Sequence, residues 1–239
     1  MLNLKSVGQS NLEASQGTRN ERYAILAKRI SDLVVIDGIV ARPWKDPSLP
    51  YFTKLSESAQ EDLLHYLEIQ GDVIARVSHG GHDLLKSCRR LALGFLKDSG
   101  LEPASDLLDH LEDDDYLAAY NHKQQMIFLS PNHLRLTSYS IEDLLCRPWP
   151  VLFRRNEMIE KILISRAIEF GRGLRTQTLV NSDIPPHFLT EVESTEVRSV
   201  TVQSKLYSPL FRDGQSAGFV SVNRSMPSIS RAMPKIEDI

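Results

Sequence analysis

The spacing of apolar residues changes along this chain, and this change limits the possible folds more than any single motif does. From residue 58 to about residue 96, apolar residues recur at the three-to-four-residue period of amphipathic helices. Ser58 and Glu61 fit a capping box at the start of the first helix. Gly80-Gly81 interrupts the pattern, and a second helix is expected over 82–96. The pattern predicts a helical hairpin.

Beyond residue 113 the apolar residues fall into short runs that are typical of strands. These runs are residues 116–120, 125–129, 174–180, 195–206 and 217–222. Asp213-Gly214, between the last two runs, is a strong signal for a hairpin turn. One longer helix is expected from Asn156 to Phe170. The order of these elements predicts an α+β fold, in which a mostly helical N-terminal region precedes an antiparallel sheet covered by helices.

Composition and pattern together divide the chain into four segments. These are a flexible polar tail (1–19), a helical N-terminal module (20–112), a sheet-containing domain (113–226) and a C-terminal tail (227–239). Inside the helical module, a first helix is expected over 22–33 and a last short one over 104–111. The acidic run 112–115, Glu-Asp-Asp-Asp, is interpreted as a solvated boundary between the module and the domain.

Bulk composition restricts the compartment and the partners. The net charge of −3 over 239 residues gives no general attraction to nucleic acid or to anionic lipid. No stretch reaches the roughly 20 apolar residues of a membrane-spanning helix, and the N-terminus lacks the apolar core of a signal peptide. Cys88 and Cys146 are too few for a disulfide framework and are expected to be reduced, buried thiols. These features favour a cytoplasmic protein that does not enter the membrane.

Two runs of the later segment, 120–153 and 208–223, carry a family pattern. The first contains Asn-His-Leu-Arg-Leu-Thr-Ser-Tyr-Ser-Ile-Glu-Asp-Leu-Leu from Asn132 to Leu145, and the second contains Asp-Gly-Gln-Ser-Ala-Gly from Asp213 to Gly218. The chain resembles the PAS sensory domains over about residues 113–226. That family usually has Leu-Thr-Gly-Tyr-Ser-x-Glu-Glu-Leu-Leu-Gly in the first position and Asp-x-x-Gly-x-x-x-Gly in the second. Ser138 and Cys146 stand where the family usually has glycine.

The resemblance implies a small sheet with helices folded over one face, which encloses either a ligand pocket or a packed core. In this family, a change in the pocket is passed to flanking helices and partners. Any ligand is expected between the long helix and the sheet, and the residues expected to line its site are Phe128, Leu144, Leu152, Ile159, Leu163, Leu179 and Val202. The alternative is that these residues form a plain apolar core.

No cofactor can be named from the resemblance. Flavin-binding members carry Asn-Cys-Arg-Phe-Leu-Gln, to which Cys146-Arg147-Pro148-Trp149 is only faintly similar. Haem-binding members take a histidine from the long helix, and residues 156–170 contain none. His133 is interpreted as a surface or packing histidine, and Arg154-Arg155 as a basic pair on a solvated face.

The segment Ser78-His79-Gly80-Gly81-His82-Asp83 is the one cluster of the N-terminal half that could be chemical. His79, His82 and Asp83 could bind a metal ion, and His82-Asp83 is similar to the doublet of metal-dependent phosphohydrolases. Ser78-His79 is also similar to the phosphoacceptor of a histidine-kinase dimerisation hairpin, although the glycines interrupt that helix. The simpler interpretation is a polar turn, with Gly81 at the bend and Asp83 or His82 capping the next helix.

The sequence therefore predicts a non-enzymatic regulatory protein of signal transduction. Its PAS-like domain is expected to act as a sensor of a small-molecule ligand or to mediate protein–protein interaction, with homodimer or partner contacts as the output. One alternative is a phosphorelay component or metal-dependent enzyme centred on His79 and His82. Another is a transcription regulator with a helix-turn-helix around Gly80-Gly81, which the acidic charge balance makes a weaker interpretation.

Overall fold

The N-terminal part of the chain is helical. The computed structural model describes residues 4–226, with side chains described from residue 18 on. The helical elements are α1 (Leu4–Val35), the 3-10 turn η1 (Phe52–Lys54), α2 (Glu57–His79), the 3-10 turn η2 (Leu84–Lys86) and α3 (Cys88–Asp98). The predicted pair of helices around Gly80-Gly81 is present as α2 and α3, but the second helix begins at Cys88, after the 3-10 turn η2, and not at residue 82.

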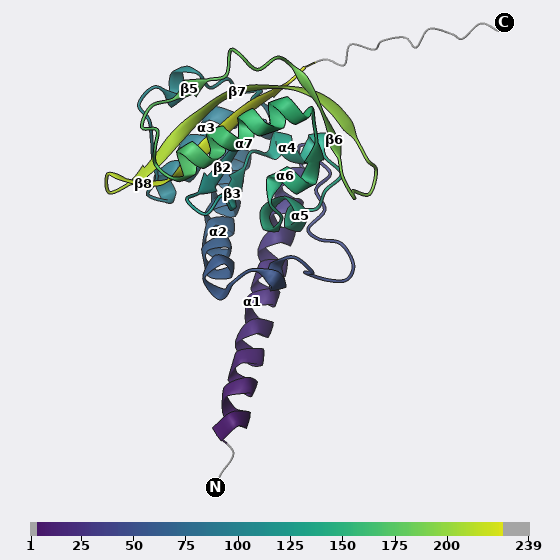
Figure 1. Cartoon of the computed structure of the whole chain (residues 1–239). Helices are drawn as coiled ribbons and strands as arrows, with labels where there is room; N and C mark the ends of the chain where they lie inside the picture. Colours follow the sequence, from purple (N-terminus) through teal and green to yellow (C-terminus); the bar gives the residue numbers. More distant parts are fainter. Residues whose placement is uncertain (1–3, 227–239) are drawn as a thin grey trace, which may run out of the picture.

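One antiparallel sheet follows (Figure 1). Its strands within the described residues are β1 (Glu102–Pro103), β2 (Tyr116–Asn121), β3 (Met126–Leu129), β4 (Phe153–Arg154), β5 (Leu179–Val180), β6 (His187–Glu191), β7 (Ser199–Arg212) and β8 (Gln215–Ser225). The order across the sheet is β3-β2-β8-β7-β6-β4, and β1 and β5 also pair with β7. The predicted α+β fold, with a helical N-terminal region and an antiparallel sheet covered by helices, is confirmed.

Helices cover both faces of this sheet (Figure 1). On one face lie the helices α4 (Pro131–Leu136), α5 (Ile141–Cys146), α6 (Trp149–Leu152) and α7 (Glu157–Gly171). Phe170 of α7 stacks on Tyr207 of β7, with ring centroids 5.9 Å apart. On the opposite face, Phe95 of α3 stacks on Phe128 of β3 at 4.5 Å. Because both faces are covered, the sheet contributes buried side chains in both directions.

The N-terminal helices and the sheet share one core. A single cluster of buried apolar side chains runs from Tyr23 on α1 to Val222 on β8. Asp115, the last residue of the acidic run, is fully buried, and its carboxylate forms ion pairs with Lys205 (2.6 Å) and Arg224 (3.1 Å). The interpretation of that run as a solvated boundary is therefore wrong for Asp115, which fastens the start of β2 to β7 and β8.

Several element boundaries differ from the sequence prediction. Helix α1 already begins at Leu4, inside the segment expected to be a tail (1–19). Helix α2 is capped by the side chain of Ser56 rather than by Ser58. The short helix expected over 104–111 is only a 3-10 turn, η3 (Leu107–Asp109), next to strand β1. The predicted C-terminal tail (227–239) lies outside the described residues.

Candidate functional site

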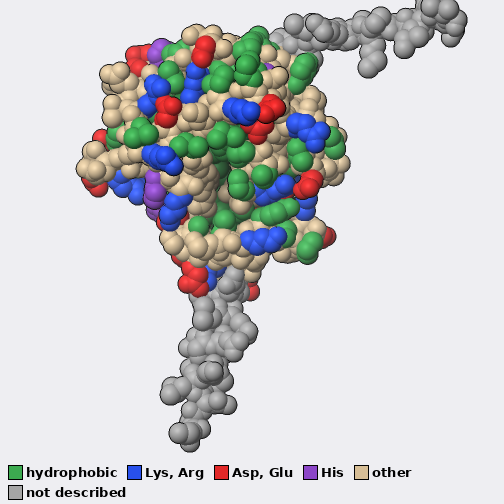
Figure 2. Space-filling view, in the orientation of Figure 1, with side chains coloured by type: hydrophobic (Ala, Val, Ile, Leu, Met, Phe, Trp, Pro, Cys, Tyr) green, Lys and Arg blue, Asp and Glu red, His purple; other side chains and the backbone are tan. Residues whose placement is uncertain are grey.

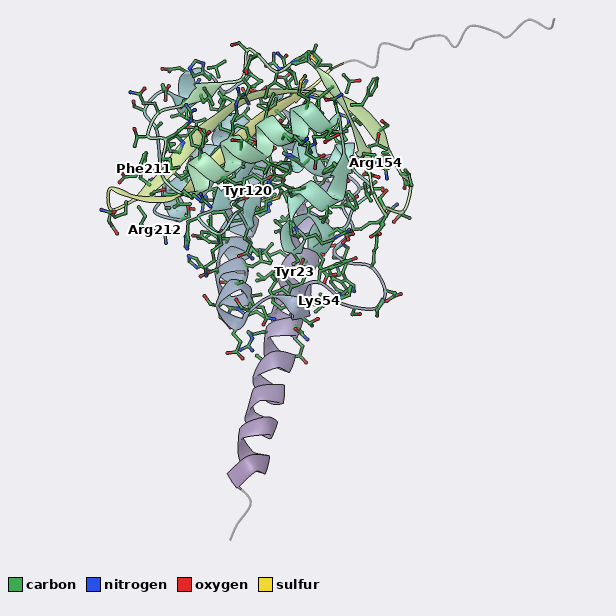
Figure 3. All side chains as sticks on the ribbon, in the orientation of Figure 1. Tyr23, Lys54, Tyr120, Arg154, Phe211 and Arg212 are labelled. Atoms are coloured by element: carbon green, nitrogen blue, oxygen red, sulfur yellow. The ribbon has the colours of Figure 1, made fainter. Side chains whose placement is uncertain are left out.

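A cavity of about 100 Å³ lies between the sheet and the helices α4 to α7. Most of its wall is apolar or aromatic. The residues that line it are Tyr116, Tyr120, Met126, His133, Leu136, Thr137, Leu144, Trp149, Leu152, Phe153, Arg155, Leu163, His187, Leu189, Val200, Val202, Tyr207, Phe219, Ser221 and Asn223. Figure 3 shows Tyr120 on the sheet beneath α7, and its ring stacks on that of Phe219 with centroids 4.9 Å apart.

A bulge in the pairing of β2 with β3 determines which of their side chains face the cavity. Tyr120 pairs with Met126, but the preceding residue Ala119 pairs with Phe128, so Ile127 is an extra residue in β3. Residues directly opposite each other on paired strands point to the same face, and a bulge changes the alternation along the bulged strand. Met126 therefore faces the cavity with Tyr120, while Phe128 faces α3.

The structure brings four of the seven expected pocket residues together. Leu144, Leu152, Leu163 and Val202 line the cavity. The other three do not. Phe128 packs on α3, Ile159 is buried in α7 away from the cavity wall, and Leu179 lies on β5 opposite Tyr207.

Two histidines of the cavity wall are neutral at pH 7. Burial lowers the pKa of His133 to about 4, and burial also lowers the pKa of His187. The Nδ1 atom of His187 lies 3.1 Å from the carbonyl oxygen of Pro185. The Nδ1 atom of His133 is buried and has no hydrogen-bond partner among the described residues. His133 is thus part of the cavity wall, a role that the sequence prediction of a surface or packing histidine did not include.

Arg155 supplies the positive charge of the cavity wall. It lies in the short connection between β4 and α7, and its guanidinium packs 4.9 Å from the ring centre of Trp149. Its Nε atom is buried without a hydrogen-bond partner among the described residues, and burial lowers the pKa of the guanidinium. The interpretation of Arg154-Arg155 as a solvated pair is therefore right for exposed Arg154 and wrong for Arg155.

A buried carboxylate holds the polar edge of the cavity. Glu191, which is 3% exposed, accepts hydrogen bonds from the hydroxyl groups of Thr137 (2.5 Å) and Ser138 (2.6 Å) and from the backbone N–H groups of Ser138 (2.6 Å) and Arg198 (3.0 Å). Burial by itself would raise the pKa of Glu191, but these hydrogen bonds outweigh it and hold the pKa at about 2. The side chain and the backbone N–H of Ser138 therefore have a structural role here.

Helix α5 connects the cavity to the N-terminal region. Leu144 of α5 lines the cavity, whereas the carboxylate of Glu142, two residues earlier, accepts hydrogen bonds from the N–H groups of Tyr51 and Phe52, both at 2.9 Å. The start of the helix is fixed by a capping box between Ser140 and Asp143. One short helix thus contacts both the cavity and the segment that precedes α2.

The Ser78–Asp83 segment forms an exposed turn between helices. His79 ends α2, Gly81 adopts a φ of 73°, and the carboxylate of Asp83 caps η2 by accepting a hydrogen bond from the N–H of Leu85 (2.8 Å). His79, His82 and Asp83 are all exposed. Among the side chains that the structure describes, from residue 18 to residue 226, no group of three or more His, Cys, Asp or Glu residues is arranged to hold a metal ion. The geometry agrees with the simpler interpretation of a polar turn.

Few sequence patterns indicate which charged and polar groups line the cavity. Tyr116 and Tyr120 could have been placed together, because they are four residues apart on one predicted strand and so share a face. Arg155 and His187 lie at the ends of short elements, where the pattern does not predict which way a side chain points.

Comparisons with known proteins do not add a family. No protein-family model matches the chain, and no curated protein matches it. In the part of the chain that the structure describes, no helix has the length and apolar character needed to cross a membrane.

Proposed function

We propose that this chain is a cytoplasmic, non-enzymatic regulatory protein whose PAS-like domain senses a small ligand in the cavity and reports it through protein contacts. The two runs that carry the resemblance support this proposal, because they lie side by side: Tyr120 of β2 pairs with Phe219 of β8. The helices α4 to α7 enclose the cavity against this sheet, as the resemblance implies.

The observation that carries the proposal is the double contact of α5. A ligand that displaces Leu144 moves the same short helix that holds the N–H groups of Tyr51 and Phe52 through Glu142. Cys146, at the end of α5, lies against Tyr23 of α1, and burial raises the pKa of both groups. A difference in ligand affinity between two positions of α5 would be enough to shift their populations.

Exposed apolar side chains offer surfaces for the output. Ile25 on α1 is 67% exposed, and Ile36 and Val40, just after this helix, are 67% and 74% exposed. Figure 2 shows further hydrophobic side chains on the face covered by α7, interspersed with charged ones. We propose that the α1 surface binds a second copy of the chain or a protein partner.

Filling the cavity tests the coupling. Val202→Phe places a larger side chain in the cavity from the sheet, far in sequence from α5, and mimics an occupied state. The matched control is Val180→Phe, because Val180 is 49% exposed and does not line the cavity. Amide hydrogen exchange is then compared for the peptide that covers residues 49–55.

We expect Val202→Phe to change the exchange rates of Tyr51 and Phe52, and Val180→Phe to leave them as in the wild type. Circular dichroism and the melting temperature establish that both variants are folded. If folded Val202→Phe exchanges at these two amides as the wild type does, the cavity is not coupled to the N-terminal region, and the proposed sensing function is wrong.

A further inference from the structure

We propose that the cavity binds a small monocarboxylate, with its carboxylate on Arg155 and a short apolar or aromatic tail among the leucine and aromatic side chains. This inference rests on the proposed ligand-sensing function and adds the chemical class of the ligand. It stands on the geometry and charge of the cavity wall.

The positive charge of Arg155 is not balanced by a neighbouring carboxylate. Within the described residues, Arg155 forms no ion pair and no hydrogen bond, although its Nε is buried. The acidic side chain whose charge acts most on it is Glu160, one turn into α7, and no ion pair joins the two. Arg155 is partly buried, and even partial burial of a cation without a counter-ion is unfavourable, because the guanidinium loses hydration. A guanidinium offers a planar pair of donors that matches a carboxylate.

The other polar groups of the wall do not supply the missing negative charge. His133 and His187 are neutral, and the hydroxyl groups of Tyr120 and Tyr207 stay protonated, because burial raises their pKa values. The ionised carboxylate of Glu191 does not line the cavity and is not among the charges that act on Arg155. Among the residues that line the cavity, Arg155 is the one charged side chain, and a single negative charge on a ligand would balance it.

Most of the remaining cavity wall is apolar. Leu144 and Leu152 come from the helices α5 and α6, Leu163 comes from α7, and Val202 and Phe219 come from the sheet. An apolar wall excludes strongly hydrated anions, because a phosphate would lose its hydration without enough donors to replace it. A ligand with one carboxylate and a hydrocarbon tail satisfies both parts of the wall.

The volume of the cavity restricts the size of the ligand. A cavity of about 150 Å³ in another protein holds benzene, and drug-sized ligands occupy about 300 Å³ or more. At about 100 Å³, this cavity suits a ligand close to isovalerate or, with slight expansion, benzoate. Flavin and haem are far too large for a space of this volume.

A second buried polar atom without a hydrogen-bond partner belongs to another residue of the cavity wall. His133 lines the cavity, and its buried Nδ1 has no hydrogen-bond partner among the described residues. Two unsatisfied polar atoms in one cavity are unusual, because buried polar groups are nearly always hydrogen-bonded. Both are explained if a polar ligand completes the site.

The test compares acids with neutral molecules of the same shape. Isothermal titration calorimetry at pH 7 and constant ionic strength measures the binding of isovalerate and benzoate, of the neutral analogues isovaleramide and benzamide, and of inorganic phosphate. The full chain is used as wild type, as Arg155→Met and as the control Arg154→Met, because Arg154 is the exposed neighbour outside the cavity wall.

We expect at least one acid to bind the wild type and Arg154→Met about tenfold or more tightly than its amide, which corresponds to one charge-assisted pair. In Arg155→Met this preference should disappear, while phosphate should bind none of the three proteins. Acids and amides that bind equally well, acids that bind Arg155→Met as they bind the wild type, or no binding by either acid would each overturn the proposal.

The two experiments distinguish a failure of the proposed ligand class from a failure of the proposed sensing function. If the amides bind and the acids do not, the carboxylate assignment is wrong, but a sensing cavity remains. If an acid binds through Arg155 and hydrogen exchange at Tyr51 and Phe52 is unchanged, the ligand class is right and the sensing function is wrong.

Discussion

Replacing Glu191 by glutamine tests whether this carboxylate holds the cavity wall together. Each of its two oxygens accepts two hydrogen bonds from the segments that contain Thr137, Ser138 and Arg198. Glutamine has the same shape but an acceptor in only one of the two positions. Its NH₂ group would therefore face two donors, in a place where the side chain is 3% exposed.

The expected loss of unfolding free energy follows from the number of hydrogen bonds that Glu191→Gln removes. Two hydrogen bonds to a charged acceptor disappear, and each contributes about 1.5–3 kcal/mol. Allowing for relaxation, we expect Glu191→Gln to lower the free energy of unfolding by about 3 kcal/mol at pH 7, measured by urea denaturation with circular dichroism. The control is Glu193→Gln. The Glu193 side chain is 77% exposed and lies 3.5 Å from Arg147. Glu193→Gln should therefore lower the free energy of unfolding by no more than about 0.5 kcal/mol.

The pH dependence of the unfolding free energy tests the role of the Glu191 carboxylate in a second, independent way. The pKa of Glu191 is about 2 in the folded protein and about 4.5 as its ordinary value. Because the folded pKa is the lower one, the carboxylate stabilises the fold fully above pH 4.5, and this contribution is lost as the pH falls from 4.5 towards 2. The difference between wild type and Glu191→Gln should therefore be smaller at pH 3 than at pH 7. A difference that does not change with pH, or a Glu191→Gln protein as stable as Glu193→Gln, would refute the reasoning.

Two further substitutions test the sheet. Gly218 has a φ of 151°, and a Cβ there would lie 1.9 Å from a backbone oxygen of β2, so Gly218→Ala should cost about 3 kcal/mol or more in unfolding free energy. Gly38→Ala, with a φ of 73° and nothing within 4 Å of the added Cβ, should cost only about 1–2 kcal/mol, and equal losses would contradict this. Lys205→Met removes an ion pair of the fully buried Asp115 and should cost about 2 kcal/mol in the same urea assay. The control is Lys161→Met, which removes an exposed ion pair and should lower the unfolding free energy by less than about 0.5 kcal/mol. A similar loss for both substitutions would show that the pair of Lys205 with buried Asp115 does not stabilise the fold.

Much of the fold could be predicted from the sequence, because the helices and strands produce local patterns of apolar and polar residues. The helical period before residue 100 and the strand-like runs after residue 113 predicted helices and strands close to their observed places. The turn at Asp213-Gly214 is also where it was predicted, between β7 and β8. Such patterns depend on residues a few positions apart, which one chain displays directly.

The candidate site was predicted only in part. Leu144 and Leu163 followed from the faces of their helices, because a helix keeps a regular period. Phe128 was misplaced because a bulge in β3 changes the alternation of the strand, and no local residue pattern marks that bulge. The acidic run was misread because the partners of Asp115, Lys205 and Arg224, are about a hundred residues away in the chain.

The helical N-terminal region, the antiparallel sheet and part of the apolar cavity wall could be predicted from the sequence, whereas strand β6 could not. The core that the N-terminal helices share with the sheet depends on tertiary packing, and no local pattern predicted it. Tertiary packing also places α5 against both the cavity and the segment around Tyr51, and leaves the partly buried Arg155 without a counter-ion among the described residues. The physical reason is that periodicity reports which face of one element is apolar, whereas the burial of a charge and its pairing depend on which distant elements meet there.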